Sequence, residues 1–391
     1  MPEPFDAVTP AAAGGSGCSP EAPAPPTVGV EEEFVLADRR TRSAVSRSLS
    51  VVRAARARLG GPHVTPELSQ SQLETVSAVC RTGAEVEAEV LRLRAGAAAA
   101  AAEHDCLLVP SGVAVLGHSG PPPVLDKARY RALAGRFGLV VHGQGVNACH
   151  VHVGVADREE AVRAVNHLRG WMPLLLALTA NSPYGDGADT GYASWRSVVW
   201  SRWPSAGPPP HLRDVAHYQR LVDRLVASGA ALDPAMVYWH VRPSAHLPTI
   251  EVRIADVLPD ARNTTAYALL VRALVGHAVE LVRSGEPAPD VPELLLRAAC
   301  WQAARHGPVG TLPGTHTRDC APTAVGRLIE ELWKRAEPYL SRHGDDRRVS
   351  AWLAHVQLNG SGSARQRRVA ERHQGGLRAV VDDLAVEVPS H

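Results

Sequence analysis

Acidic, imidazole and guanidinium side chains recur at alternate positions in short segments of the sequence. In the segment TVGVEEEFVL, residues 27–36, one residue separates Glu31 from Glu33. Successive side chains of a strand point to opposite faces, so these two carboxylates would share a face about 7 Å apart. Hard divalent cations prefer such oxygen ligands. A solvated sheet face is the alternative for a single pair of this kind.

A second segment, GVNACHVHVGV at 145–155, places His150 and His152 on one face and valines on the other. Imidazoles at this spacing can bind metal or phosphate, form a zinc pair, or be satisfied by hydrogen bonds. The pattern leaves open which histidine is a ligand. By the same alternation Cys149 faces the core, which argues against its being a nucleophile.

Two further segments extend the pattern, PTIEVRIAD at 248–256 and AMVYWHVR at 235–242. Glu251 and Arg253 share one face of the first, and Arg242 lies on the polar face of the second. A carboxylate beside a guanidinium can hold a cation and bind an anion through two nitrogens. An ion pair within the sheet is the alternative.

The four segments share one design, an apolar face and a face of Glu, His or Arg. This repetition favours a nucleotide cavity over a solvated face. The stretch PELSQSQLE adds Glu67 and Glu74 to the polar set, and Glu74 has the parity of Gln72; for Glu67, helix capping is the alternative. Gly143-x-Gly145 lacks the third glycine of a dinucleotide fingerprint, and no Walker A pattern occurs. If ATP is used, metal ions and arginines would therefore have to neutralise its charge.

The elements that position these residues do not follow the regular βα order of a doubly wound fold. The four segments are the predicted strands. Helices are predicted at 84–103, 158–179, 213–228, 261–284, 292–305, 323–342 and 362–384. The simplest arrangement is an α+β fold, with a mainly antiparallel sheet and helices on one side. The segment 181–210, rich in Gly, Pro and aromatics, predicts a long ordered loop over a site rather than regular structure.

The composition is that of a soluble globular protein, with 45% hydrophobic residues and a net charge of +1. We therefore expect no nucleic-acid or membrane partner. We expect no stretch long and apolar enough to span a bilayer, and six scattered cysteines argue against a disulfide framework. We expect a cytoplasmic protein with a disordered tail at 1–26 and a single catalytic domain at 27–391, helical in its C-terminal part.

Several motifs together resemble the carboxylate-amine ligase family, also called type 2 glutamate–cysteine ligases. They are GVEEEF (29–34), CHVHVGV (149–155), DTGYASWRSVVWSRWPSAGPPP (189–210), RPSAHLPTIEVRIAD (242–256) and ARQRRVAER (364–372). The resemblance runs from about Thr27 to Leu384. It implies a fold similar to the catalytic domain of glutamine synthetase, an antiparallel sheet funnel with helices on its outer face. ATP would bind at one end of the funnel and the amino-acid substrate at the other.

The resemblance also implies a role for each candidate residue. The magnesium ligands would be Glu31, Glu33, Glu74, His152 and Glu251. The catalytic residues would be Arg196 and Arg253, and the ATP contacts His150 and Arg196. The substrate contacts would be Arg242, His118 and Trp203. The segment GVAVLGHSG at 112–120 departs from the Gly-Thr-His-Pro run that is usual in the family, although His118 is kept.

The predicted reaction is ATP-dependent amide formation. The side-chain carboxylate of glutamate would attack the γ-phosphorus of ATP, and an amine such as cysteine would attack the resulting acyl phosphate. One alternative is a zinc hydrolase that uses His150 and His152 and needs no ATP. Another is a catalytically silent protein that binds an amino acid or nucleotide. The acceptor amine stays open, and so does the oligomeric state, for which a homo-oligomer is one option.

Overall fold

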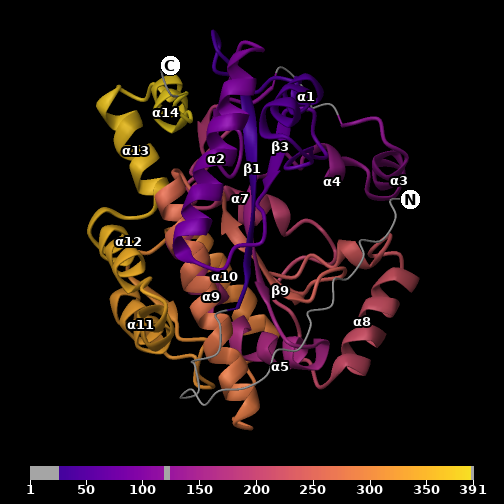
Figure 1. The fold of residues 1–391 in the computed structure, drawn as a ribbon, viewed down its shortest axis with the longest axis vertical. Coiled ribbons are helices and arrows are strands. Elements are labelled where there is room, and N and C mark those ends of the chain that lie inside the picture. The colour runs from indigo at the N-terminus through magenta and orange to yellow at the C-terminus, as the bar shows by residue number, and fades with distance from the viewer. Residues whose placement is uncertain (1–25, 119–123, 389–391) are drawn as a thin grey trace, which may run out of the picture.

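An antiparallel sheet runs through the centre of the molecule (Figure 1). The computed structural model describes residues 26–118 and 124–388. Within them the sheet has seven strands in the order β2-β3-β1-β5-β9-β8, with β4 paired to the end of β1. The strands of this sheet are β1 Val28–Asp38, β2 Val64–Pro66, β3 Gln72–Val76, β4 Cys106–Val109, β5 Ala148–Gly154, β8 Val241–Pro243 and β9 Thr249–Asp256. The predicted α+β fold is confirmed. The predicted tail at 1–26 lies outside the described residues except for Pro26.

Helices surround the sheet, and Figure 1 shows α11 to α14 along one side of the molecule and α3 and α8 on the other. The α-helices are α1 Ser48–Leu59, α2 Gly83–Ala102, α3 Ala128–Phe137, α4 Leu139–His142, α5 Arg158–Leu168, α6 Met172–Thr179, α7 Trp195–Trp200, α8 Val215–Ala227, α9 Ala261–Arg283, α10 Glu293–His306, α11 Val325–Arg342, α12 Asp346–Asn359, α13 Gly362–Arg372 and α14 Leu377–Leu384. Two 3₁₀ helices are η1 Arg169–Trp171 and η2 Pro234–Met236. Short two-stranded sheets are β6 Tyr184–Gly185 with β7 Ala188–Asp189, and β10 Thr311–Pro313 with β11 Pro322–Ala324.

The register of the sheet fixes which side chains share its apolar face. Val30 of β1 pairs with Val151 of β5, which pairs with Val252 of β9. These buried side chains pack with α5, α6 and α9 in the largest core. Removing apolar surface from water at about 25 cal/mol per Å² is the main favourable term that holds these helices on the sheet. Cys149 is fully buried in this core, as its parity predicts.

Glu32 lies on the apolar face and is almost completely buried. Its carboxylate accepts hydrogen bonds from Arg94 Nε at 3.0 Å and Arg94 Nη2 at 2.6 Å, and from Thr264 Oγ1 at 2.7 Å. A carboxylate can be buried when it is paired and hydrogen-bonded in this way. The Glu32 side chain therefore ties β1 to α2 and α9.

Several predicted elements differ in extent from those observed. The strand predicted at 235–242 pairs only from Val241, because the chain first forms the 3₁₀ helix η2, whose first residue is Pro234. The helix predicted at 158–179 is divided by η1. The helix predicted at 362–384 is interrupted where Gln374 and Gly375 adopt φ of 54° and 85°, outside the helical range.

The segment 181–210 is ordered, as predicted, but it also contains the β6–β7 hairpin and α7. Asp256, at the end of β9, holds it in place. The Asp256 carboxylate accepts hydrogen bonds from Asn181 N at 2.8 Å, Ser182 Oγ at 2.7 Å and Ser194 Oγ at 2.7 Å. Because Asp256 is fully buried, these bonds fix the start of the segment against the sheet.

Helix α9 is long and apolar enough to cross a membrane by length and composition alone. The expectation that no stretch would be so apolar is therefore wrong. Of the most apolar part of this helix, 67% is buried, and the helix packs against α2, α5, α11 and β5. Helix α9 is therefore a central helix of the hydrophobic core.

Candidate active site

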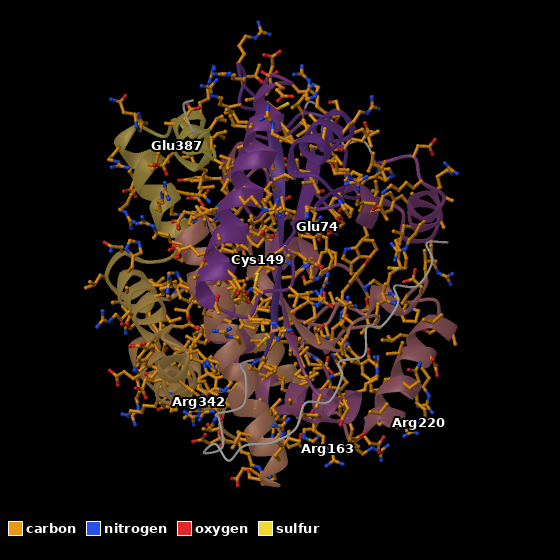
Figure 2. All side chains as sticks on the ribbon, in the orientation of Figure 1. Glu74, Cys149, Arg163, Arg220, Arg342 and Glu387 are labelled. Carbon is orange, nitrogen blue, oxygen red and sulfur yellow. The ribbon has the colours of Figure 1, made fainter. Side chains whose placement is uncertain are left out.

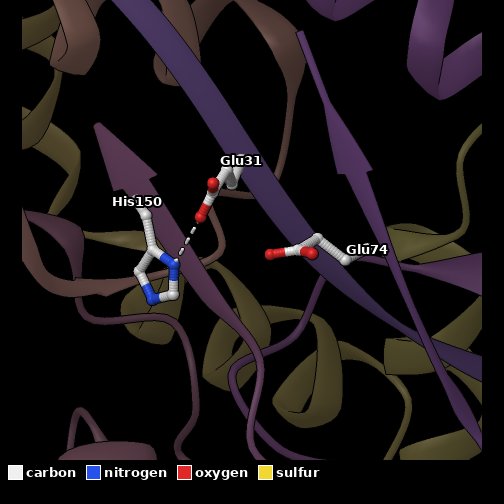
Figure 3. Close-up of side chains that lie close together, drawn as sticks. All are labelled: Glu31, Glu74 and His150. Carbon is white, nitrogen blue, oxygen red and sulfur yellow. Dashed lines mark hydrogen bonds and ion pairs between the residues drawn. The ribbon is translucent and has the colours of Figure 1, made fainter. Parts of the chain in front are cut away.

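The other face of the sheet carries the carboxylates and imidazoles, which the register brings side by side. The cross-strand pairs are Glu33 with Glu74, Glu31 with His150, and His152 with Glu251. Opposite residues on one face have Cβ atoms only about 5 Å apart, so their side chains can contact one ligand. Figure 3 shows Glu31, Glu74 and His150 directed toward the same space. Figure 2 shows Glu74 near the middle of the molecule, while Arg220 and Glu387 lie at its periphery.

Seven side chains of this face, which we call the acidic face, form three overlapping groups of possible metal ligands. The groups are Glu31, Glu74 and His150; Glu31, His152 and Glu251; and Glu33, Glu67 and Glu74. In each group one ligand atom from every residue lies within 4.8 Å of the others. Each group has at least two carboxylates and at most one imidazole. This donor set suits Mg²⁺, which prefers oxygen, better than Zn²⁺.

Glu67 belongs to the acidic face, and its interpretation as a helix cap is wrong. The residue follows β2, and no helix begins there. Its carboxylate accepts one long hydrogen bond, from Leu68 N at 3.3 Å. Burial, together with the charge of Glu31, raises the pKa of Glu67. Its only sequence signal is its position in the same polar stretch as Glu74.

The carboxylates at the β1–β3 end of the acidic face repel one another. Burial and the charge of Glu67 raise the pKa of Glu33 to about 8. Burial and three acidic neighbours raise the pKa of Glu74 well above its usual value. Both shifts mean that, without a bound cation, burial and like charges disfavour the ionised forms of these two groups. A divalent cation would supply the missing positive charge.

At the β5–β9 end of the acidic face, neighbouring histidines and arginines compensate the negative charge of Glu31 and Glu251. Burial alone would raise the pKa of Glu31, but the hydrogen-bonded ring of His150 and the nearby ring of His152, whose Nε2 lies 3.4 Å from Glu31 Oε1, lower it well below its usual value. Burial also opposes ionisation of Glu251, yet the charges of Arg253 and Arg242 hold its pKa far below the usual range. Burial and Arg253 lower the pKa of His150 to about 4, which keeps this imidazole neutral.

Two arginines flank Glu251 and differ in how many of their donors are used. Arg253 donates to the Glu251 carboxylate, and its Nε has no partner among the described residues. Arg242 Nε lies 2.8 Å from Glu251 Oε2, and Arg242 Nη1 donates to the carbonyls of Ala235 and Val237 at 3.0 and 2.7 Å. Arg253 is therefore better placed than Arg242 to bind an added anion.

Arg196 and Trp203 lie in the segment that follows the β6–β7 hairpin. Arg196 is buried and donates to the carbonyls of Ile254 and Arg253 at 3.2 and 3.1 Å. Its Nε has no partner among the described residues. Trp203 is buried against Phe137, with ring centroids 5.2 Å apart. The structure therefore brings Arg196 to β9 but places Trp203 in an aromatic cluster.

Two cavities lie at the two ends of the acidic face along β1. The larger, of about 910 Å³, is lined at the sheet by Gly29, Glu31 and His152, and also by Arg283 of α9 and Tyr339 of α11. Cavities of several hundred Å³ are typical of small-molecule sites. The volume of this one is sufficient for a nucleotide.

The smaller cavity has a volume of about 390 Å³ and lies beyond Glu33. Val35 and Gln72 form its floor, and His118, Asp186 and Trp195 line it. Val35 follows Glu33 on the same face of β1. The structure therefore places His118 in the smaller cavity, and along β1 Glu33 lies between this cavity and the larger one, which Glu31 lines.

Comparisons with known proteins agree on one family. Residues 27–383 match the family described as glutamate-cysteine ligase family 2. The chain is 45% identical over 363 residues to a Saccharopolyspora erythraea protein with the provisional name glutamate–cysteine ligase 2-1, covering 92% of this chain and 94% of that protein. It is 43% identical over 368 residues to glutamate–cysteine ligase 2-2 of Mycolicibacterium vanbaalenii, also provisionally named, with coverages of 93% and 96%.

A similar fold occurs in a solved structure of glutamate–cysteine ligase from Francisella tularensis in complex with AMP. The TM-score is 0.70 at 13% identity, over 94% of this chain and 90% of that chain. A bifunctional glutathione synthetase from Pasteurella multocida gives a TM-score of 0.66 at 14% identity, covering 92% of this chain and 52% of that chain. At these identities the likeness is one of fold.

Proposed function

Because this chain belongs to glutamate–cysteine ligase family 2, we propose that its acidic face joins the side-chain carboxylate of L-glutamate to an amine such as L-cysteine. Membership of the family establishes the reaction class, ATP-dependent amide-bond formation from small-molecule substrates. One observation carries the proposed site: five glutamates and two histidines converge on one sheet face between two cavities. We place the enzyme in the cytoplasm, with residues 27–391 as a single catalytic domain.

Mg²⁺ fits the acidic face for two reasons. The raised pKa values of Glu33 and Glu74 mean that burial and neighbouring carboxylates disfavour their ionised forms, which a bound cation would favour. His152 Nε2 is buried without a hydrogen-bond partner among the described residues. The residues that would hold the metal are Glu31, Glu33, Glu67, Glu74, Glu251 and His152. When bound, Mg²⁺ supplies positive charge that offsets the repulsion between phosphate and carboxylate oxygens.

In the proposed reaction the protein's own groups position ATP, bind the reacting oxygens and limit the access of water. ATP occupies the larger cavity, with its triphosphate toward Glu31 and His152. The free Nε of Arg253 binds an oxygen of the reacting carboxylate or phosphoryl group. The carboxylate attacks the γ-phosphorus and ADP leaves; the amine then attacks the acyl carbon, loses a proton and expels phosphate. The ordered segment 181–210 limits the access of water, which would otherwise hydrolyse the acyl phosphate.

The geometry does not favour a zinc hydrolase. His150 and His152 fall in different ligand groups, and each of these groups contains two carboxylates. His150 Nδ1 lies 3.1 Å from Glu31, whereas His152 Nδ1 lies 3.0 Å from Thr249 Oγ1. Zinc sites built on histidines bring two or three imidazoles to one metal. A catalytically silent binding protein is also disfavoured, because the family's reaction class is established and the acidic and basic groups are both present.

ADP release tests the proposal. The enzyme is incubated with ATP, Mg²⁺, glutamate and a panel of amines, and the product is identified by mass spectrometry. We expect ADP release that requires glutamate and one class of amine, with one amide formed per ADP. Glu33→Gln should abolish it, whereas Glu103→Gln, at an exposed glutamate beyond α2, should not. No ADP release in any mixture, or a zinc-dependent hydrolysis without ATP, would refute the proposal.

A further inference from the structure

The smaller cavity contains hydrogen-bond acceptors that the protein does not use. Gln72, 3% exposed, donates its amide to Val146 O at 2.6 Å and to Asn147 Oδ1 at 2.9 Å. These two bonds fix the orientation of the amide and leave its Oε1 without a partner among the described residues. A buried, unpaired acceptor of this kind indicates a missing donor. The donor could come from a ligand in the cavity.

Asp186 adds a carboxylate to the same cavity. It lies in the turn of the β6–β7 hairpin at φ 50°, in the left-handed region, which Asp and Asn tolerate better than other residues with a side chain. Two backbone hydrogen bonds fix the turn to the facing segment. Asp186 N donates to Ala114 O at 3.3 Å, and Gly187 N donates to Val115 O at 2.9 Å. The carboxylate fits only because residue 117 is glycine, since an added Cβ there would lie 2.1 Å from Asp186 Oδ1.

The position of the cavity indicates which substrate it receives. In phosphoryl transfer the attacking and leaving oxygens lie roughly in line on opposite sides of phosphorus. If ADP leaves toward the larger cavity, the attacking carboxylate must approach from the other end of the acidic face. The body of the carboxylate substrate then extends past Glu33 toward Val35 and Gln72, into the smaller cavity.

From these observations we infer that the smaller cavity binds the ammonium group of the carboxylate substrate, through Asp186 and Gln72 Oε1. This inference rests on the proposed function and deepens it. An ammonium group supplies three N–H donors and a positive charge, which matches two acceptors of which one is anionic. Asp186 would then be a specificity-determining residue, because it separates an amino-dicarboxylate from a plain dicarboxylate.

Calorimetric titration of glutamate and glutarate tests this inference, since glutarate differs only by lacking the amino group. The protein is saturated with Mg²⁺ and a non-hydrolysable ATP analogue, so binding is measured without turnover. We expect glutamate to bind on the order of tenfold to a hundredfold more tightly than glutarate. Asp186→Asn should remove most of this preference by weakening glutamate binding, while glutarate affinity changes less than about twofold. Asn tolerates the positive φ, so the turn is kept.

Gly117→Ala provides an independent second variant, because the new methyl group must displace the Asp186 carboxylate. It should reduce the same preference without changing affinity for the ATP analogue. Equal binding of glutamate and glutarate by the unaltered protein would overturn the inference. An equal loss of affinity for glutamate and glutarate in Asp186→Asn would also overturn it, because that result would assign Asp186 a structural role. Either result can occur in an enzyme that still releases ADP, so the inference can fail while the proposed function stands.

Discussion

The carboxylates of the acidic face differ in how far their charge is compensated. Glu251 is paired with Arg242 and Arg253, whereas Glu33 and Glu74 face each other and Glu67. A buried carboxylate that faces other carboxylates is a cost to folding unless a proton or a cation is bound. We therefore expect opposite effects on stability when single glutamates at the two ends are neutralised.

Glu74→Gln should stabilise the metal-free protein and remove its activity. Loss of one repelling charge should raise the free energy of unfolding in EDTA at pH 8 by about 1 kcal/mol, as measured by urea denaturation. The same substitution should lower Mg²⁺-dependent ADP release at least about a hundredfold, because a metal ligand is lost. A variant that is less stable than the parent in EDTA would contradict the repulsion between these carboxylates.

Glu251→Gln is the matched substitution at the compensated end and should destabilise the fold. It leaves the guanidinium groups of Arg242 and Arg253 without their carboxylate in a buried position. Breaking a buried pair in this way costs about 3 kcal/mol or more. The urea midpoint should therefore fall in the presence and the absence of Mg²⁺. An unchanged midpoint would show that the carboxylate is not needed to hold the two arginines.

The pH dependence of stability should include a contribution from His240. Its ring lies 3.7 Å from Cys300 Sγ, and burial with the charges of Arg196 and Arg297 lowers its pKa to about 3. The unfolded state, with a pKa near 6.5, binds more protons below that pH, so stability falls as the pH drops through this range. His240→Gln should make the decline in the free energy of unfolding with falling pH shallower by at most about 1.4 kcal/mol per pH unit. Denaturation at pH 7.5 and 5.5 checks this, and equal slopes would contradict it.

At the scale of elements, the pair Glu32–Arg94 attaches the strand of the acidic face to α2. Arg94→Met should destabilise the protein by about 3–5 kcal/mol, because Glu32 would stay buried and uncompensated. Combining it with Glu32→Leu, which is also made alone, should restore most of the lost free energy of unfolding, since an apolar pair removes the desolvation cost. Urea denaturation of the three variants measures this coupling. A double variant no more stable than Arg94→Met would assign the pair a role beyond charge compensation.

The motif ARQRRVAER holds the β6–β7 hairpin from outside. Arg367 of α13 donates to the Asp189 carboxylate at 2.9 and 3.2 Å and to Tyr192 O at 2.9 Å. Gln366 donates to Asn181 Oδ1 at 2.8 Å. These bonds steady the turn that carries Asp186, so we regard Arg367 as a positioning residue.

Arg367→Gln should raise KM for glutamate about three- to tenfold and leave kcat and the KM for ATP nearly unchanged. Arg367→Lys keeps the charge and should recover part of the effect. Steady-state ADP release at varied glutamate and varied ATP measures both constants. A parallel rise of both KM values would indicate a general loss of structure instead.

At the scale of the whole molecule, the sequence predicted best what depends on local alternation. The shared faces of Glu31 with Glu33 and of His150 with His152 follow from a two-residue period that needs no tertiary information. The structure confirms these faces through the strand register. The strand predicted at 235–242 is too long. Pro234 starts the 3₁₀ helix η2, which includes the first two residues of the predicted strand despite their alternating pattern.

Features that depend on distant segments could not be predicted in this way. No local pattern explains why Glu32 lies on the apolar face, because its partner Arg94 is on a helix 62 residues away. Glu67 reaches the acidic face because β2 pairs with β3, and Asp186 lines the smaller cavity because the β6–β7 hairpin lies near Val35 of β1; no local pattern records either placement. The apolar length of helix α9 is explained by its burial in the core, which composition alone does not show.

The central claim is that this one sheet face holds divalent cations for ATP-dependent amide formation. Anomalous X-ray diffraction from crystals soaked with Mn²⁺ and a non-hydrolysable ATP analogue tests it directly, because Mn²⁺ shares the oxygen preference of Mg²⁺. The account predicts anomalous peaks among Glu31, Glu33, Glu74 and Glu251, with the nucleotide in the larger cavity. Peaks confined to other surfaces, with the acidic face occupied by water alone, would contradict it.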